Sequence, residues 1–83
     1  MFFVYLIQSQ KYGTFYIGQS NNTQERLKYH NRGKCTYTRN KGPWRLIAYK
    51  EFATRSEAMA EEKRLKGFKN RQAVMTEFGL YLT

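Results

Sequence analysis

The sequence predicts a small α+β domain with elements in the order strand, strand, helix, strand, helix, helix. Two runs rich in β-branched and aromatic residues, 2–7 and 14–20, flank a polar turn that contains Gly13. A third run of this kind covers 44–52, and the segments between and after these runs begin with typical helix N-cap residues. The chain has 83 residues, 41% of them apolar. That length predicts one domain, 1–83, with a small core.

The first two runs form a predicted hairpin, around which the rest of the chain is organised. Each carries a tyrosine near its middle, Tyr5 and Tyr16, and directly opposed residues of an antiparallel pair share a face. The sequence permits a register with these two opposite each other, which a slip of one residue would undo. Gly18 inside the second run indicates close approach of a ligand or another backbone. The apolar start is too short for a membrane span and lacks a basic signal-peptide region, so we interpret it as a strand of the mature fold.

The first helix is predicted over 24–32, after the N-cap residues 21–23 and before Gly33. Arg26 and His30 lie four residues apart, so they share one face of this helix. If the helix packs on the sheet, both side chains are brought close to the hairpin. The alternative is a surface arginine and a solvated histidine.

The loop 33–43 is basic and interleaved with hydroxyl and aromatic residues, a composition that can follow a phosphate backbone. The alternative is an ordinary solvated loop. In the following strand, 44–52, alternation places four apolar residues on one face: Trp44, Leu46, Ala48 and Phe52. Ile47 and Tyr49 fall on the other face. The pattern predicts a central strand that is covered on both faces, with Trp44 in the core.

A capping box at 54–57 begins the second predicted helix. Glu62 lies with Ala58 and Leu65 on the stripe that should face the sheet, and Glu61 lies on the flank of this stripe. Helical geometry does not choose between the two glutamates. A carboxylate in this place needs a cation, a metal ion or a hydrogen-bond network, and the simplest alternative is a salt bridge to a neighbouring lysine or arginine.

The second helix is expected to end at Gly67. A short third helix is predicted over 70–78, with Asn70 as its N-cap and Gly79 as its end. We interpret Asn70 as a cap first and as a site residue second.

The charge of the chain predicts a polyanionic partner, most often nucleic acid, because the formal net charge is +9. The alternative is a basic protein without such a partner. Cys35 is the single cysteine, which excludes a disulfide framework and a zinc knuckle and suits a reduced, cytoplasmic compartment. All six acidic residues are glutamates. This disfavours a two-metal nuclease with clustered carboxylates, but one Mg²⁺ held by a carboxylate, waters and a substrate phosphate remains compatible.

From Phe3 to about Arg71 the chain resembles the GIY-YIG nuclease family. Within that family it resembles the small, UPF0213-like single-domain bacterial members, similar to the catalytic module of structure-specific endonucleases. Tyr16-Ile17-Gly18 matches the second name-giving motif, and Phe3-Val4-Tyr5 stands at the first, with its tyrosine retained. The other matching segments are Gln19-Ser20-Asn21-Asn22, Arg26-Leu27, His30, Tyr37-Thr38-Arg39, Pro43-Trp44-Arg45-Leu46 and Arg55-Ser56-Glu57-Ala58.

The resemblance implies a three-stranded, largely antiparallel mixed sheet flanked by helices, and metal-dependent phosphodiester hydrolysis. Its catalytic positions fall on the general-base or water-orienting phenol Tyr5, the second phenol Tyr16, the phosphate-binding Arg26, the supporting imidazole His30 and the metal-binding Glu62. The choice of Glu62 over Glu61 rests on the resemblance. Whether Tyr5 or His30 is the kinetic base stays open at this point, since the imidazole could take the proton on from a tyrosine.

We therefore expect an endonuclease, or a nuclease module, that cuts branched, damaged or duplex DNA with one Mg²⁺ or Mn²⁺ ion. Five residues are expected to bind the DNA: Lys34, Tyr37, Arg39, Lys41 and Arg45. RNA is a second candidate substrate, and a protein partner is a candidate for substrate selection. The alternatives are a non-catalytic nucleic-acid-binding module and a nuclease subunit that needs its partner. We expect no membrane association.

Overall fold

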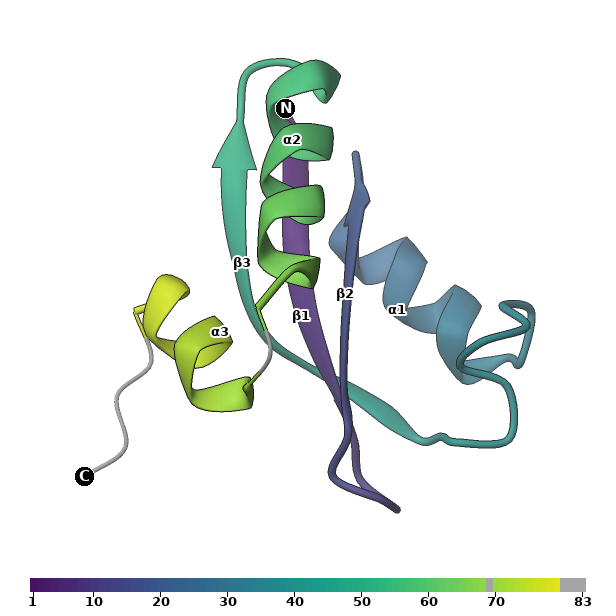
Figure 1. Ribbon diagram of the computed structural model, residues 1–83. Coiled ribbons are helices and arrows are strands. Elements are labelled where there is room, and N and C mark those ends of the chain that lie inside the picture. The colour runs from purple at the N-terminus through teal and green to yellow at the C-terminus, as the bar shows by residue number, and fades with distance from the viewer. Residues whose placement is uncertain (69, 80–83) are drawn as a thin grey trace.

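A computed structural model describes residues 1–68 and 70–79 and shows a three-stranded sheet with three helices (Figure 1). The strands are β1 (Phe2–Ser9), β2 (Phe15–Ser20) and β3 (Trp44–Phe52), in the spatial order β2-β1-β3 with both pairings antiparallel. The helices are α1 (Thr23–Asn31), α2 (Arg55–Lys66) and α3 (Arg71–Glu77). The predicted α+β class and element order are confirmed. Residues 80–83 of the expected domain lie outside the described part.

The helix N-termini are fixed by the caps that the sequence predicts. The side chain of Asn22 accepts a hydrogen bond from Glu25 N, and that of Asn70 accepts one from Ala73 N. At α2 the Thr54 side chain accepts from the Glu57 backbone while the Glu57 carboxylate accepts in return, a complete capping box. The polar caps therefore set where each helix begins, and α1 starts and ends one residue earlier than expected.

The sheet carries a core on each of its faces. α2 runs along β1 on one face (Figure 1), where six residues are buried together: Val4, Leu6, Ile17, Ala58, Leu65 and Val74. α1 covers the other face, where Tyr5, Ile7 and Trp44 are buried with Leu27 beside them. Burying a leucine or isoleucine contributes about 1.5–3 kcal/mol, so these two layers hold the helices to the sheet. Among the described residues no helix has the length and hydropathy needed to cross a bilayer.

The prediction that 44–52 is a central strand is wrong, because β1 is central and β3 lies at an edge. The register with β1 also shifts between Leu6 and Ile7, which pair with Ala48 and Leu46. Ile47 is the extra residue of this irregularity, and it packs with the α2-side core while Trp44 packs on the α1 side. The expected single apolar face is therefore split. Trp44 is a core residue as predicted, at 3% exposure.

The hairpin register differs by two residues from the one, permitted by the sequence, that sets Tyr5 opposite Tyr16. Tyr5 lies opposite Gly18, and Ile7 lies opposite Tyr16, so the two tyrosines share a face as diagonal neighbours. The reason is a shorter turn, since β1 continues to Ser9, whose hydroxyl accepts hydrogen bonds from the turn amides of Lys11 and Tyr12. Gly13 completes the turn with φ +76°, in the left-handed region.

Candidate active site

Three buried side chains form a continuous hydrogen-bonded chain in the α1-side layer. Tyr5 Oη lies 2.9 Å from His30 Nε2, and His30 Nδ1 lies 2.7 Å from Thr38 Oγ1. Their exposed fractions are 2%, 3% and 1%. Each comes from a different element: the centre of β1, the last turn of α1 and the loop before β3. Two residues predicted to be catalytic are thus in direct contact.

Gly18 makes room for the Tyr5 side chain. A Cβ atom at Gly18 would stand 2.3 Å from Tyr5 Oη and 2.5 Å from Cζ, distances at which the ring would have to move. The group that approaches this glycine in the structure is therefore the Tyr5 phenol of the neighbouring strand. The expectation of a ligand or another backbone at this position is corrected accordingly.

Thr38 was missed by the sequence reasoning as a site residue, although it stands inside one of the segments that carry the family resemblance. Its backbone oxygen accepts a hydrogen bond of 3.1 Å from Trp44 Nε1. Trp44 is held in turn by Asn31, whose side chain accepts from Trp44 N at 2.6 Å and donates to Trp44 O at 3.1 Å. The loop hydroxyl is thereby fixed against both α1 and β3. Apart from its place in that segment, no feature of the sequence distinguishes it from the neighbouring Thr36.

Tyr16 lies in an aromatic cluster around His30. Its ring centroid is 5.0 Å from that of His30 and 5.5 Å from that of Tyr37. Lys66 Nζ, from the last turn of α2, lies 5.4 Å from the Tyr16 ring, a distance suited to a cation–π contact. Tyr16 therefore connects the buried hydrogen-bonded chain to the exposed Tyr37 and to α2.

The charges of Arg26 and Glu62 act on the Tyr5 phenol, and that of Arg26 also acts on the His30 imidazole. Burial is the main cause that raises the pKa of Tyr5, and the charges of Tyr16 and Glu62 add to this rise. Arg26 opposes the rise in part, through its charge and a hydrogen bond. Burial, with Arg26 as a second cause, lowers the pKa of His30 to about 4. At neutral pH both Tyr5 and His30 are therefore uncharged. Tyr16, Arg26 and Glu62 thus all act on the Tyr5 phenol, which contacts His30 directly.

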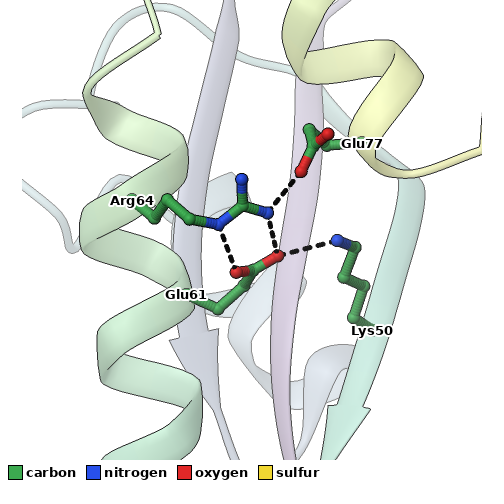
Figure 2. A network of polar contacts seen from close by, with 4 residues as sticks. All are labelled: Lys50, Glu61, Arg64 and Glu77. Atoms are coloured by element: carbon green, nitrogen blue, oxygen red, sulfur yellow. Dashed lines mark hydrogen bonds and ion pairs between the residues drawn. The ribbon is translucent and has the colours of Figure 1, made fainter.

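Glu61 and Glu62 have different partners, and this separates their roles. Glu61 is 14% exposed and bonds Lys50 at 2.7 Å and Arg64 through both oxygens at 2.8 Å, while Arg64 also pairs with Glu77 (Figure 2). Arg64 first, with Lys50, holds the pKa of Glu61 at about 2. Glu61 is thus engaged in a network that joins α2, β3 and α3.

Glu62 is connected to Tyr16 through Lys66, whose ammonium group pairs with the carboxylate and also lies over the Tyr16 ring. Its charge contributes to raising the pKa of both Tyr5 and Tyr16, after burial as the main cause. Its carboxylate pairs with Lys66 at 2.9 Å, and the side chain is 22% exposed. The salt bridge that the sequence offered as the alternative to a metal site is therefore present. It leaves the Glu62 carboxylate partly open to solvent.

Comparison with known proteins identifies the family of the chain. Residues 1–76 match the GIY-YIG catalytic domain family. The chain belongs to this family. It is 37% identical over 83 residues to the UPF0213 protein BH0048 of Halalkalibacterium halodurans, covering 95% of this chain and 87% of that protein. It is 40% identical over 65 residues to the UPF0213 protein OB0043 of Oceanobacillus iheyensis, covering 77% and 74%.

The fold is also similar to a solved member of the family. The solution NMR structure of the UPF0213 protein BH0048, from Bacillus halodurans, aligns with a TM-score of 0.56 at 34% identity, over 95% of this chain and 88% of that one. Membership of the GIY-YIG family places the chain among nucleases. The name UPF0213 states neither a substrate nor a metal.

The donor atoms of this GIY-YIG site suit a hard cation that keeps most of its waters. Residues 1–68 and 70–79 contain no group of three or more His, Cys, Asp or Glu side chains able to hold a metal ion together. Glu62 offers one partly exposed carboxylate near Tyr5 and Tyr16, the phenols predicted to be catalytic. Mg²⁺ is commonly bound through one or two carboxylates, waters and a substrate phosphate, so this donor set is compatible with one such ion.

The residues expected to bind DNA fall into several places around the GIY-YIG site. Lys34 lines a polar hollow of about 310 Å³ together with Arg26. Tyr37 is 61% exposed, stacks near Tyr16, and has Lys41 Nζ 4.4 Å from its ring. Arg39 and Lys41 line a separate hollow beside Tyr12.

Arg45 stands apart from these residues. It pairs with Gln8 and lies between Trp44 and Leu46, which both pack on the α1 side, so strand alternation places it on the other face of the sheet. A larger hollow, of about 540 Å³, adjoins Tyr16 between β2, α2 and α3. Aromatic and cationic side chains line it: Phe15, Tyr16, Tyr37, Phe68, Lys66 and Arg71.

Proposed function

We propose that this GIY-YIG domain is an endonuclease that hydrolyses phosphodiester bonds in DNA, branched or damaged DNA included, with one Mg²⁺ or Mn²⁺ ion. The observation that carries the proposal is the buried contact between Tyr5 and His30, with Arg26 and Glu62 both acting on the Tyr5 phenol. RNA presents the same phosphodiester chemistry and is the second candidate substrate.

The residues supply the groups that attack on phosphorus requires. The attacking water must lose a proton, and negative charge on the non-bridging oxygens must be stabilised. Tyr5 and His30 offer a phenol and an imidazole in hydrogen-bond contact for the first task. Arg26 presents a planar donor fork suited to phosphate for the second. A metal ion at Glu62 would add Lewis-acid stabilisation of the phosphate charge when bound.

The surface around the site suits a nucleic-acid strand. The protein carries a net charge of +9, and non-specific nucleic-acid affinity comes mainly from such cations. Tyr37 and the hollow beside Tyr16 offer aromatic faces on which bases can stack. The single cysteine supports a cytoplasmic location, where thiols stay reduced.

The test is a cleavage assay on flap, fork, junction, duplex and single-stranded DNAs and on RNA of matched sequence, with Mg²⁺, Mn²⁺ or EDTA. We expect metal-dependent cutting that Glu62→Gln abolishes. Glu51→Gln, at an exposed position of β3, removes the same charge as a matched control and should cut normally. Binding without cutting under every condition would refute the enzyme and favour a binding module. Cutting that appears only when a candidate partner is added would identify a partner-dependent subunit.

A further inference from the structure

β2 forms one edge of the sheet, so half of its backbone groups have no neighbouring strand (Figure 1). Ser9 N donates to Thr14 O at 2.9 Å, and the direction of the N–H and C=O groups alternates along each strand. The groups of Phe15, Ile17 and Gln19 therefore point away from β1. Within residues 1–68 and 70–79 these groups have no hydrogen-bond partner. Ile17 is only 8% exposed, and backbone groups shielded from water need a partner.

The hollow of about 540 Å³ runs along this free edge. Three consecutive residues of β2 line it, Phe15, Tyr16 and Ile17. Consecutive side chains of a strand point to opposite faces of the sheet, so a hollow that touches all three lies at the outer edge of the strand. Its other walls come from both sides of the sheet, with Leu65 from α2 and Tyr37 from the loop that packs near Tyr16. The unpaired edge of β2 is thus the floor of this hollow.

The walls of the hollow are cationic and aromatic. Among the described residues that line it, Lys66 and Arg71 are cationic and none is acidic. The Arg71 guanidinium carbon lies 4.5 Å from the centroid of the Phe15 ring, and Arg71 Nη2 donates to Gly13 O at 2.7 Å. Arg71 is therefore held against the ring from two directions. A guanidinium fixed in this way is a platform on which a nucleobase can stack, and its charge attracts phosphate.

The shape of the hollow favours a single base over an added peptide strand. A peptide strand would pair along the whole edge of β2, at Phe15, Ile17 and Gln19 together. The hollow reaches only the first two of these residues, and its volume lies in the range of about 300–1,000 Å³ that is usual for small-ligand sites. Every nucleobase carries a hydrogen-bond donor and an acceptor side by side on its Watson–Crick edge, which complements one outward N–H and C=O pair.

We propose that this hollow binds one unstacked nucleobase of a nucleic-acid strand, whose Watson–Crick edge pairs with the backbone N–H and C=O of Ile17 and whose ring stacks on Arg71. Tyr16 borders both the hollow and the predicted catalytic cluster, so the bound base belongs to a nucleotide next to the scissile phosphate. That placement rests on the proposed function, whereas binding of the base does not.

The test compares two strands that differ only in their bases. The ¹⁵N-labelled protein, kept free of metal with EDTA, is titrated with a short oligothymidylate and with a strand of equal length and charge from which every base is missing. The oligothymidylate should shift the Ile17 amide resonance and slow its hydrogen exchange. The abasic strand should bind about tenfold more weakly or worse and leave Ile17 unmoved, because stacking and edge pairing are lost. Equal affinities with an unmoved Ile17 amide would overturn the proposal.

Two matched arginine variants test the platform. Arg71→Lys keeps the charge and loses the planar group, so it should weaken oligothymidylate binding about fivefold or more and leave the abasic strand unaffected. Arg55→Lys is the control, since Arg55 lies 4.9 Å from the Phe2 ring at the other end of α2 and does not line the hollow. It should change neither affinity. Equal losses for both strands in Arg71→Lys would assign Arg71 to phosphate alone and overturn its stacking role.

A peptide and the cleavage assay separate the remaining outcomes. If an extended acidic peptide shifts the Phe15, Ile17 and Gln19 amides together while the oligothymidylate shifts none of them, the edge is a protein interface and the proposal is overturned. Base-dependent binding at Ile17 in a protein that cuts no substrate would refute the proposed function and support this inference. Cutting without base-dependent binding would do the opposite.

Discussion

Gly18 lies directly opposite Tyr5 in the β1–β2 pair, and the Tyr5 ring occupies the space where a side chain at Gly18 would begin. In this chain the second motif therefore needs a glycine at this position, because the tyrosine of the first motif lies across it. The same packing brings Tyr5 Oη to His30 Nε2 at 2.9 Å.

Gly18→Ala should displace the Tyr5 ring and break its hydrogen bond to His30. The added Cβ would lie 2.3 Å from Tyr5 Oη, and the pairing of β1 with β2 holds the Tyr5 backbone directly opposite position 18. We expect a loss of about 1–3 kcal/mol in the free energy of unfolding, as for other overpacked sites, together with loss of cutting. Urea unfolding and the cleavage assay measure the two effects.

The companion variant Tyr5→Leu, which has no atoms at the ring's far end, tests the cause. In that background Gly18→Ala should cost clearly less stability than in the wild type, since the two residues are in contact. Additive costs would show that the alanine acts through the strand backbone.

His30 should make the protein less stable in mild acid. Its pKa is about 4 in the folded state, against 6.5 ordinarily, because burial disfavours the charged imidazole. Between these values the unfolded chain binds more protons than the folded one. The contribution of neutral His30 to the free energy of unfolding is therefore fully present above pH 6.5. It is lost toward pH 4, a fall on the order of 3 kcal/mol. Thermal unfolding midpoints across this range measure the fall.

His30→Gln removes the titrating group and should flatten the stability curve between pH 6.5 and 4. A second fall should remain in both proteins, because the pKa of Glu61 is about 2 against 4.5 ordinarily, so the stability that its ion pairs contribute is lost as pH falls from 4.5 toward 2. An unchanged curve above pH 4.5 in the His30→Gln protein would assign the acid sensitivity to other groups.

Local patterns in the sequence predicted most of the fold. The N-cap residues, the capping box and the strand compositions act over a few neighbours, so the helices and strands begin within a residue or two of the predicted places. The errors concern pairing. Ser9 lengthens β1 through hydrogen bonds to turn amides, and the irregularity at Ile47 divides the apolar face of β3. Both depend on contacts that composition does not encode.

In the candidate site, too, local spacing was predictable from the sequence, whereas long-range contacts were not. The spacing of Arg26 and His30 predicted that both could approach the hairpin, and the resemblance assigned Glu62 ahead of Glu61, a choice that helical geometry left open. The part played by Thr38 could not be predicted, because it depends on Trp44 and Asn31 fixing a loop from two sides. No sequence pattern predicts that a threonine in a basic loop will make a buried hydrogen bond.

The two neighbouring glutamates should separate stability from activity. Glu61→Gln removes the mostly buried charge that Lys50 and Arg64 share (Figure 2), so it should lower the unfolding midpoint and leave cutting measurable. Glu62→Gln should do the reverse, since its partner is the half-exposed Lys66. Calorimetry and cleavage of one substrate check both variants. If Glu61→Gln loses cutting at a temperature where it is fully folded, the metal-binding carboxylate would be Glu61 and not Glu62.

Phosphate contacts near the site should appear in the salt dependence of DNA binding. The Glu62→Gln protein, titrated with a fluorescent oligonucleotide without metal, isolates binding from cutting. Each phosphate contact contributes about 0.9 to the slope of log K against log salt on duplex DNA. Lys34→Gln, in the hollow beside Arg26, should therefore lower the slope by about one contact. Lys63→Gln, on an exposed position of α2, removes the same charge and should change the slope less. Equal losses in the two variants would mean that the affinity follows net charge alone and that the DNA has no fixed path across the site.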